Sequence, residues 1–248
     1  MQTKTLIVAG LLAAASSPVI AKDSLEVGLG AQFRSTAYAG YDDSARAIPL
    51  LSFDTTWFYA DGAEIGVKAL DKGPHRIGIF VTISEEEWDA GDSDDFKAFD
   101  DKDRAFHVGA SYRYKAKWGV VKAKYFTDVS DEHEGNGGAI SYAYPWKVSN
   151  KFMVIPSIKY KYLDEDYANY YYGISARDAA TTAGVEAYDT GSASKITLGV
   201  MTRYAFTKQW AMYAGANYTM LDSDLEDSPL LDDDKETSFI LGAAYKFW

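Results

Sequence analysis

Histidine is the residue type here that could do acid–base or metal chemistry, and the chain has three: His75, His107 and His133. Cysteine is absent and no second histidine stands at a ligand spacing from any of them, so no metal site is predicted. Ser111 follows His107 by four positions, about 13 Å along a strand, whereas a serine hydrolase needs its serine in contact with the base. We assign no catalytic residue and interpret His107 as a polar space-filling residue. A serine from a neighbouring strand could still approach it, so a membrane lipase or deacylase remains an alternative.

Clustered carboxylates are the second group of residues that could do chemistry. Asp222, Asp224, Glu226 and Asp227 alternate in one segment, and the run 232–234 follows. Oxygen clusters suit Ca²⁺ or Mg²⁺, but this spacing lacks the glycine and final glutamate of a helix–loop–helix calcium site. We interpret the segment as a solvated loop and predict no cofactor. Weak divalent binding that bridges to lipopolysaccharide phosphates is the alternative.

The acidic residues are concentrated in a few parts of the chain. The net charge is −11, and 30 of the 36 acids lie in five stretches: 38–46, 85–103, 128–136, 164–192 and 222–236. The segments between them carry few acids and form no basic patch or stripe, so nucleic acid is excluded as a partner.

The segments between the acidic stretches alternate apolar and polar residues with a period of two, as strands do. In Leu25 to Arg34, for example, the odd positions are apolar and the even positions are polar or glycine. The predicted strands are 24–37, 47–59, 63–70, 76–84, 104–116, 119–129, 137–147, 151–163, 193–206, 209–221 and 237–248.

Such strands can face lipid only if the wall closes on itself, so the sequence predicts an all-β, closed antiparallel transmembrane barrel. Bacterial single-chain barrels have an even number of strands, so eleven segments mean that one is miscounted. We predict 12 strands, with 10 as the alternative. The missing strand is expected in 183–190 or near 90–100, unless an early short segment lies outside the wall.

The first 21 residues are predicted to be a cleaved signal peptide, and 22–248 the barrel. Lys4 provides the positive start, Leu6 to Ala15 the short apolar run, and Val19 to Ala21 the cleavage site. The protein is therefore expected in the outer membrane of a Gram-negative bacterium, in contact with its lipids and lipopolysaccharide. The last strand, with Tyr245, Phe247 and Trp248, is expected to pair with the first strand and close the wall.

If the apolar face of each strand points to lipid, the opposite face gives the barrel a basic lumen. The inward acids are Glu26, Asp54 and Glu64. We expect long basic side chains to fill a narrow barrel and pair with loop carboxylates folded inward. An anion-preferring channel or ligand-binding lumen is the alternative. The inward bases are Arg34, Lys68, Arg76, Arg113, Lys122, Lys124, Lys159, Lys161, Lys195, Arg203 and Lys246.

Two loop segments resemble a known family. One contains Tyr170, Tyr171, Tyr172, Gly173, Ile174 and Ser175, and the other contains Asp227, Ser228 and Pro229. Together they resemble the MltA-interacting protein (MipA) and OmpV family of outer-membrane proteins, from about residue 24 to the C-terminus. The resemblance implies a non-enzymatic outer-membrane barrel. For one branch it also implies a scaffold that joins a lytic transglycosylase to a murein synthase.

The same loop residues have a structural interpretation. Gly173 and Pro229 are turn formers. The three consecutive tyrosines are expected to pack their long loop down onto the barrel mouth and plug the lumen. A direct role in partner binding is the alternative.

Overall fold

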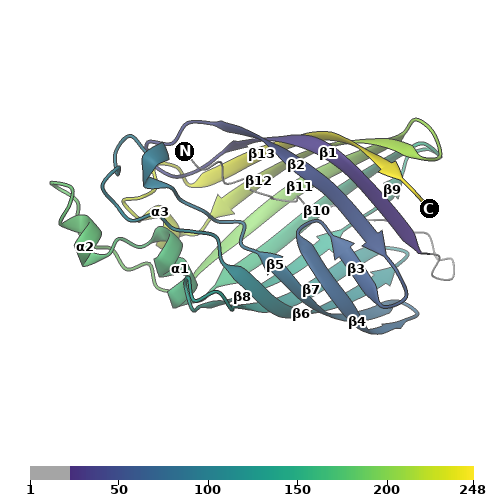
Figure 1. Ribbon diagram of the computed structural model, residues 1–248, viewed down its shortest axis with the longest axis horizontal. Helices are drawn as coiled ribbons and strands as arrows, with labels where there is room; N and C mark the ends of the chain where they lie inside the picture. The colour runs from purple at the N-terminus through teal and green to yellow at the C-terminus, as the bar shows by residue number, and fades with distance from the viewer. Residues whose placement is uncertain (1–22) are drawn as a thin grey trace.

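The structure is a computed structural model that describes residues 23–248, and it forms a β-barrel with short helices at one end (Figure 1). The predicted signal peptide lies outside the described residues. Within residues 23–248 no helix is both long and apolar enough to cross a bilayer. The strands are β1 Ser24–Ser35, β2 Ser44–Asp54, β3 Phe58–Asp61, β4 Glu64–Lys72, β5 His75–Ile83, β6 Phe106–Ala116, β7 Gly119–Asp128, β8 Asn136–Ala143, β9 Trp146–Lys147, β10 Phe152–Leu163, β11 Ala193–Ala205, β12 Trp210–Leu221 and β13 Lys235–Lys246. The helices are η1 Ala90–Asp92, α1 Glu165–Tyr172, α2 Ala176–Ala179 and α3 Ser223–Glu226.

The wall is closed and antiparallel. The terminal strand β13 pairs with β1 from Glu26↔Lys246 to Ser35↔Thr237, which joins the two ends of the sheet. Strands β8 and β9 both pair with β10, so they occupy one position in the wall. The 13 segments therefore make a barrel of 12 strands, which confirms the predicted fold and strand number.

The strand missing from the sequence prediction is β3. The predicted strand 47–59 is in fact β2 and the first residues of β3, separated by a turn at 55–57. A strand of four residues is too short to show an alternation of its own, which is why the pattern merged the two. The expected strands at 183–190 and 90–100 are wrong, and no early segment leaves the wall.

Once β3 is counted as a strand, each connection between strands can be assigned to one end of the barrel. The short turns 55–57, 73–74, 117–118, 148–151 and 206–209 lie at one end, and all long loops lie at the other. Outer-membrane barrels place short turns in the periplasm, so the long loops with α1, α2 and α3 are extracellular. Figure 1 shows these helices at one end and the C-terminus at the other.

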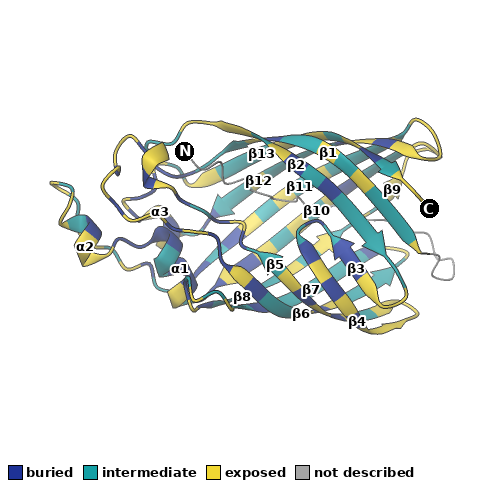
Figure 2. Ribbon diagram, in the orientation of Figure 1, coloured by how far each residue is buried: buried dark blue, intermediate teal, exposed yellow. Residues whose placement is uncertain are grey.

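The outer surface is an apolar band. Along most strands, exposed and buried residues alternate, as the colours in Figure 2 show. In β13, for example, Phe239 and Leu241 are exposed while Ile240 between them is buried. Apolar groups facing lipid and polar groups facing the lumen produce this alternation.

The apolar core lies at the extracellular end, where the loops pack on one another and fill the mouth. Tyr167, Tyr171 and Tyr172 of α1 are completely buried there, as are Leu225 and Leu230 of the last loop. Burying one large apolar side chain contributes about 1.5–3 kcal/mol. We call this packed unit, formed by loops 36–43, 84–105, 129–135, 164–192 and 222–234, the plug.

Candidate functional site

Glu86, from the plug, is the centre of a charged layer beneath it. Lys161 Nζ lies 2.7 and 2.9 Å from its two carboxylate oxygens, and Lys195 Nζ lies 3.5 Å from one of them. Tyr167 donates its hydroxyl to the same carboxylate at 2.5 Å. Although burial opposes ionisation, Lys161 and Lys195 hold the pKa of Glu86 well below its ordinary value. Glu86 is therefore charged at neutral pH and links two strands of the wall to the plug.

The charged layer continues on both sides of Glu86. Lys159 Nζ donates to both oxygens of Glu85 at 3.2 and 3.1 Å, and it holds the pKa of Glu85 below its ordinary value. On the other side, Glu236 lies 3.4 Å from Arg34 Nη2 and 3.8 Å from Lys195 Nζ. Four of the predicted lumen bases thus lie in one layer and face carboxylates.

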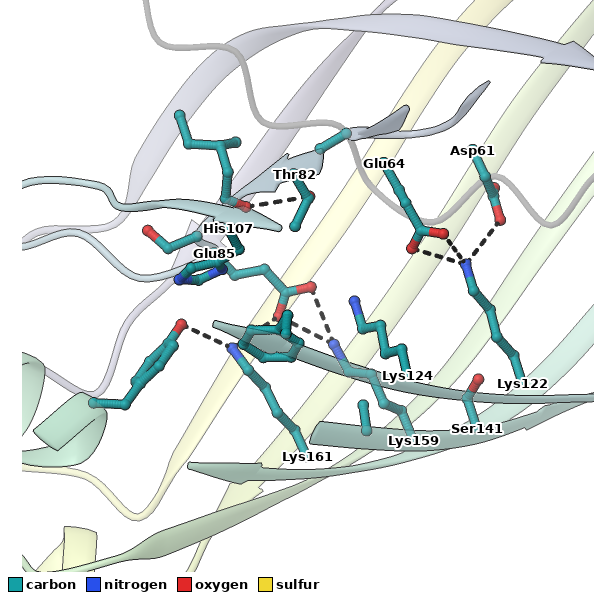
Figure 3. Close-up of a pocket in the computed structure, with 16 residues that line it drawn as sticks. Asp61, Glu64, Thr82, Glu85, His107, Lys122, Lys124, Ser141, Lys159 and Lys161 are labelled. Carbon is teal, nitrogen blue, oxygen red and sulfur yellow. Dashed lines mark hydrogen bonds and ion pairs between the residues drawn. The ribbon is translucent and has the colours of Figure 1, made fainter. Parts of the chain in front are cut away.

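Two small cavities adjoin this layer, with volumes of about 80 and 150 Å³. Both are lined by Glu85, Lys159 and Lys161, so they meet at the layer. Figure 3 shows the first cavity, with Lys124 between the Lys122–Glu64 pair and the Glu85–Lys159 pair. Pockets for drug-sized ligands measure about 300–1,000 Å³, so these cavities suit a small anion or a headgroup.

Two cations on the cavities have no carboxylate within ion-pair distance among residues 23–248. Lys124 Nζ lies 5.9 and 5.5 Å from the ring centres of Phe80 and Phe126. Arg46 donates from Nε to Gln32 Oε1 at 3.0 Å. Positive charge that is partly removed from water and lacks a counter-ion attracts an anion. The extracellular half of the lumen is therefore suited to bind negative groups.

The periplasmic half of the lumen is more completely paired. Asp54 accepts hydrogen bonds from Lys68 and Arg76, and Arg76 also lies 2.6 Å from Asp71. Lys122 lies 2.9 Å from Glu64. Carboxylates from neighbouring strands therefore neutralise these bases, which leaves little free charge in this half.

The remaining predicted lumen bases lie towards the same end. Arg203 donates to the Tyr213 hydroxyl at 2.9 Å and lies 3.9 Å from Glu26. Arg113 stands in register between Arg76 and Lys122 on the neighbouring strands. Lys246 ends β13 and is exposed.

The tyrosine segment anchors the plug. Tyr171 donates to the Asp103 carbonyl at 2.9 Å, and Tyr170 donates to Glu132 at 3.1 Å. The Tyr172 hydroxyl accepts from Lys195, and Ser228 donates to the Tyr172 carbonyl. The two segments that carry the family resemblance thus meet at Tyr172.

The other motif residues shape the chain on either side. Gly173 ends α1, and a Cβ there would lie 2.5 Å from the Asn169 carbonyl oxygen, so no larger residue fits without a shift. Ser175 caps α2 by accepting from the Asp178 amide at 3.0 Å. Asp227 ends α3, and Pro229 lies between the buried Ser228 and Leu230.

Among residues 23–248, no histidine forms a hydrogen bond with a serine hydroxyl. His107 Nε2 lies 2.8 Å from His133 Nε2, whereas Ser111 Oγ lies 3.3 Å from the Tyr59 hydroxyl. His75 is elsewhere, beside Tyr112 at the periplasmic end. Among the described residues no three His, Asp or Glu side chains cluster as metal ligands.

Sequence reasoning missed four residues of the charged layer and its cavities. Arg46 and Glu236 each lie one residue outside a predicted strand, so the alternation did not include them. Glu85 and Glu86 belong to the acidic stretch 85–103, in which the sequence does not distinguish inward carboxylates from solvated ones. Only the expectation that some loop carboxylates fold inward pointed to them.

A closed wall with an apolar outer band and a polar lumen defines an outer-membrane β-barrel, here with a plugged extracellular mouth. The chain belongs to the MltA-interacting protein family, because the family description "MltA-interacting protein MipA" matches residues 27–247. The resemblance predicted from the two loop segments and the outer-membrane location are thereby confirmed.

Known relatives are similar along nearly the whole chain. The putative outer membrane protein YiaT of Escherichia coli K12 is 26% identical over 225 residues, which cover 90% of this chain and 91% of the relative. The MltA-interacting protein of the same strain is 25% identical over 245 residues, 98% of each chain. Among solved structures, an outer membrane channel from Pseudomonas putida F1 has a TM-score of 0.48 and 10% identity, covering 95% of this chain and 98% of that one.

Proposed function

We propose that this protein is a non-enzymatic scaffold of the outer membrane that holds a murein lytic transglycosylase, and with it a murein synthase, at the periplasmic end of the barrel. The relative named MltA-interacting protein supports the choice of partner. The plug supports a scaffold over an open channel, because packed side chains fill the extracellular mouth.

The observation that carries the proposal is the charge of the periplasmic rim. The short turns and strand ends there carry six exposed lysines, whereas the extracellular loops are acidic. The nearby acids are Asp23, Asp54 and Asp71, and Arg76 pairs with both Asp54 and Asp71. Complementary charge steers association and fixes orientation, so this rim suits an acidic protein surface. The rim lysines are Lys72, Lys117, Lys147, Lys151, Lys208 and Lys246.

Charge reversal at this rim tests the proposal. We expect the detergent-purified barrel to retain a lytic transglycosylase from a periplasmic extract at low salt. The triple variant Lys117→Glu, Lys151→Glu, Lys208→Glu should lose most of that retention, because each change repels an acidic partner.

The matched control reverses charge at the other end. Lys97→Glu with Arg177→Glu alters two exposed extracellular residues and should leave retention unchanged. Recovery of neither murein enzyme by the unaltered barrel, or equal loss in both variants, would count against a periplasmic docking rim.

A further inference from the structure

The wall of the barrel is incomplete on one side. The hairpin of β3 and β4 turns back at Gly62, and on the β2 side it covers only Ser52 to Asp54. On the β5 side the pairing with β4 ends at Val81. Figure 1 shows this short hairpin beside β2, with strands of the far wall visible between β2 and β5.

Backbone groups are therefore left without strand partners around an opening. Residues 44–51 of β2 have no strand partner on this side among residues 23–248, nor do Thr82 and Ile83 of β5. Hydrocarbon cannot satisfy such groups, and unpaired backbone at membrane depth occurs only where it lines protein or water. Pro49, which has no N–H to donate, stands in this stretch of β2, as prolines do on free edges. This opening between β2 and β5, the gap, is therefore lined by protein or water rather than by hydrocarbon.

The two cavities reach the rim of this gap. Ala63 at the hairpin tip and Thr82 and Ile83 at the end of β5 line the first cavity, which also contains Lys124. Arg46, on the free edge of β2, lines the second. Glu85, which lines both, keeps 51% of its side chain exposed although it pairs with Lys159 inside the barrel. The lumen beneath the plug is therefore continuous with the gap.

The gap opens towards the outer leaflet. It lies on the extracellular side of the hairpin tip, and Val81 beside it is lipid-facing and 54% exposed. Two strands are missing at this height, so the β2 and β5 backbones stand about 14 Å apart at strand spacing. That width admits one or two acyl chains.

We propose that this gap is a lateral portal through which the barrel takes up a single-chain anionic amphiphile from the outer leaflet, with the acyl chain in the gap and the phosphate or carboxylate headgroup beside Lys124 in the first cavity. The inference is independent of the scaffold, because it uses neither the periplasmic rim nor a protein partner.

The chemistry of the lining selects this ligand. Among the described residues that line the first cavity, Lys124 is the cation without a carboxylate at ion-pair distance, so an anionic headgroup supplies the missing counter-charge. The cavities are large enough for such a headgroup but too small for a whole lipid. On the lipid side, Ala47 and Pro49 of β2 and Ile83 of β5 offer apolar contact to a chain.

Native mass spectrometry of the barrel in a neutral detergent tests the portal, with dodecyl phosphate as the probe. We expect one saturable adduct, at least about tenfold weaker binding of inorganic phosphate, and no adduct with dodecyltrimethylammonium. Lys124→Gln should weaken dodecyl phosphate binding about tenfold, whereas Lys72→Gln at the far end should not.

A second pair of variants separates the portal from a site reached another way. Ala47→Trp places a bulky ring on the lipid side of β2 beside the gap, outside both cavities, and should weaken dodecyl phosphate about tenfold without changing inorganic phosphate. Ala110→Trp, on the lipid-facing surface of β6, is the matched control and should change neither. Equal affinity for dodecyl phosphate and inorganic phosphate, or binding unchanged by Ala47→Trp and Lys124→Gln, would overturn the proposal.

Discussion

At the scale of single residues, the plug depends on a few buried polar groups. Glu86 is only 2% exposed and satisfies two lysines and a tyrosine from three different elements. Removing one partner of a buried pair leaves uncompensated charge, which costs more than the pair itself contributes. The neighbouring Glu85 makes a similar contact with Lys159, but half of its side chain is exposed.

This difference predicts unequal effects of the same substitution. Glu86→Gln should lower the free energy of unfolding by about 3–5 kcal/mol, because Lys161 and Lys195 lose their shared counter-ion. Glu85→Gln should lower it by less than about 1 kcal/mol, since water screens that pair. Urea unfolding followed by the heat-modifiable gel shift measures both, and equal losses would refute the central role of Glu86.

At the scale of elements, the strands can be predicted from sequence because lipid-facing and lumen-facing residues alternate along each one. The short hairpin of β3 and β4 cannot be predicted in this way, since β3 has four residues and leaves no periodic signal. The plug contacts were not readable either. Glu86 and Lys161 are 75 positions apart, and no local pattern records which carboxylate of an acidic loop turns inward. The tyrosine segment did indicate packing onto the mouth, although its partners were not evident.

The loop 129–135 is an element whose closure should depend on pH. The Gly135 amide donates to His133 Nδ1 at 2.9 Å, so neutral His133 carries its proton on Nε2 and donates to His107. Burial lowers the pKa of His133. Above pH of about 6.5 the closed loop keeps its full stability, because His133 is neutral whether the loop is open or closed. As the pH falls below that value, the open loop binds the proton that the closed loop resists, and closure weakens.

Hydrogen exchange checks this expectation. Protection of amides 132–135, corrected for the intrinsic rate, should fall between pH 7.5 and pH 5. His133→Gln should reduce the pH dependence, because only His107, which His133 contacts, is then left to bind a proton when the loop opens. His75→Gln, at the other end of the barrel, should retain it in full. An unchanged slope in His133→Gln would show that another group controls the loop.

At the scale of the whole molecule, the barrel is a ring of 12 strands whose extracellular end is filled by its own loops. Tyr38, Trp88 and the α1 tyrosines come from loops far apart in sequence, yet they form one core. A pore blocked in this way should conduct poorly in spite of its basic lumen.

Planar-bilayer conductance tests how far the α1 loop closes the pore. Replacing residues 165–190 by a short turn should raise the conductance above that of the unaltered barrel, because it removes the buried tyrosines. Replacing only 176–186, which leaves α1 in place, should keep the barrel nearly silent. Equal conductance in the two variants would mean that the other loops seal the mouth alone.

The short hairpin of β3 and β4, which leaves a slit between β2 and β5, also has a mechanical consequence. A cylinder slit along part of one side loses much of its resistance to twisting, unless something braces the slit. Residues 84–93 run from the end of β5 to the bridge between Tyr41 and Ser93, just beyond the start of β2, and so connect the two sides at the extracellular end of the slit. The stiffness of the wall then depends on the packing of the plug, so loosening the loops should let the whole barrel twist.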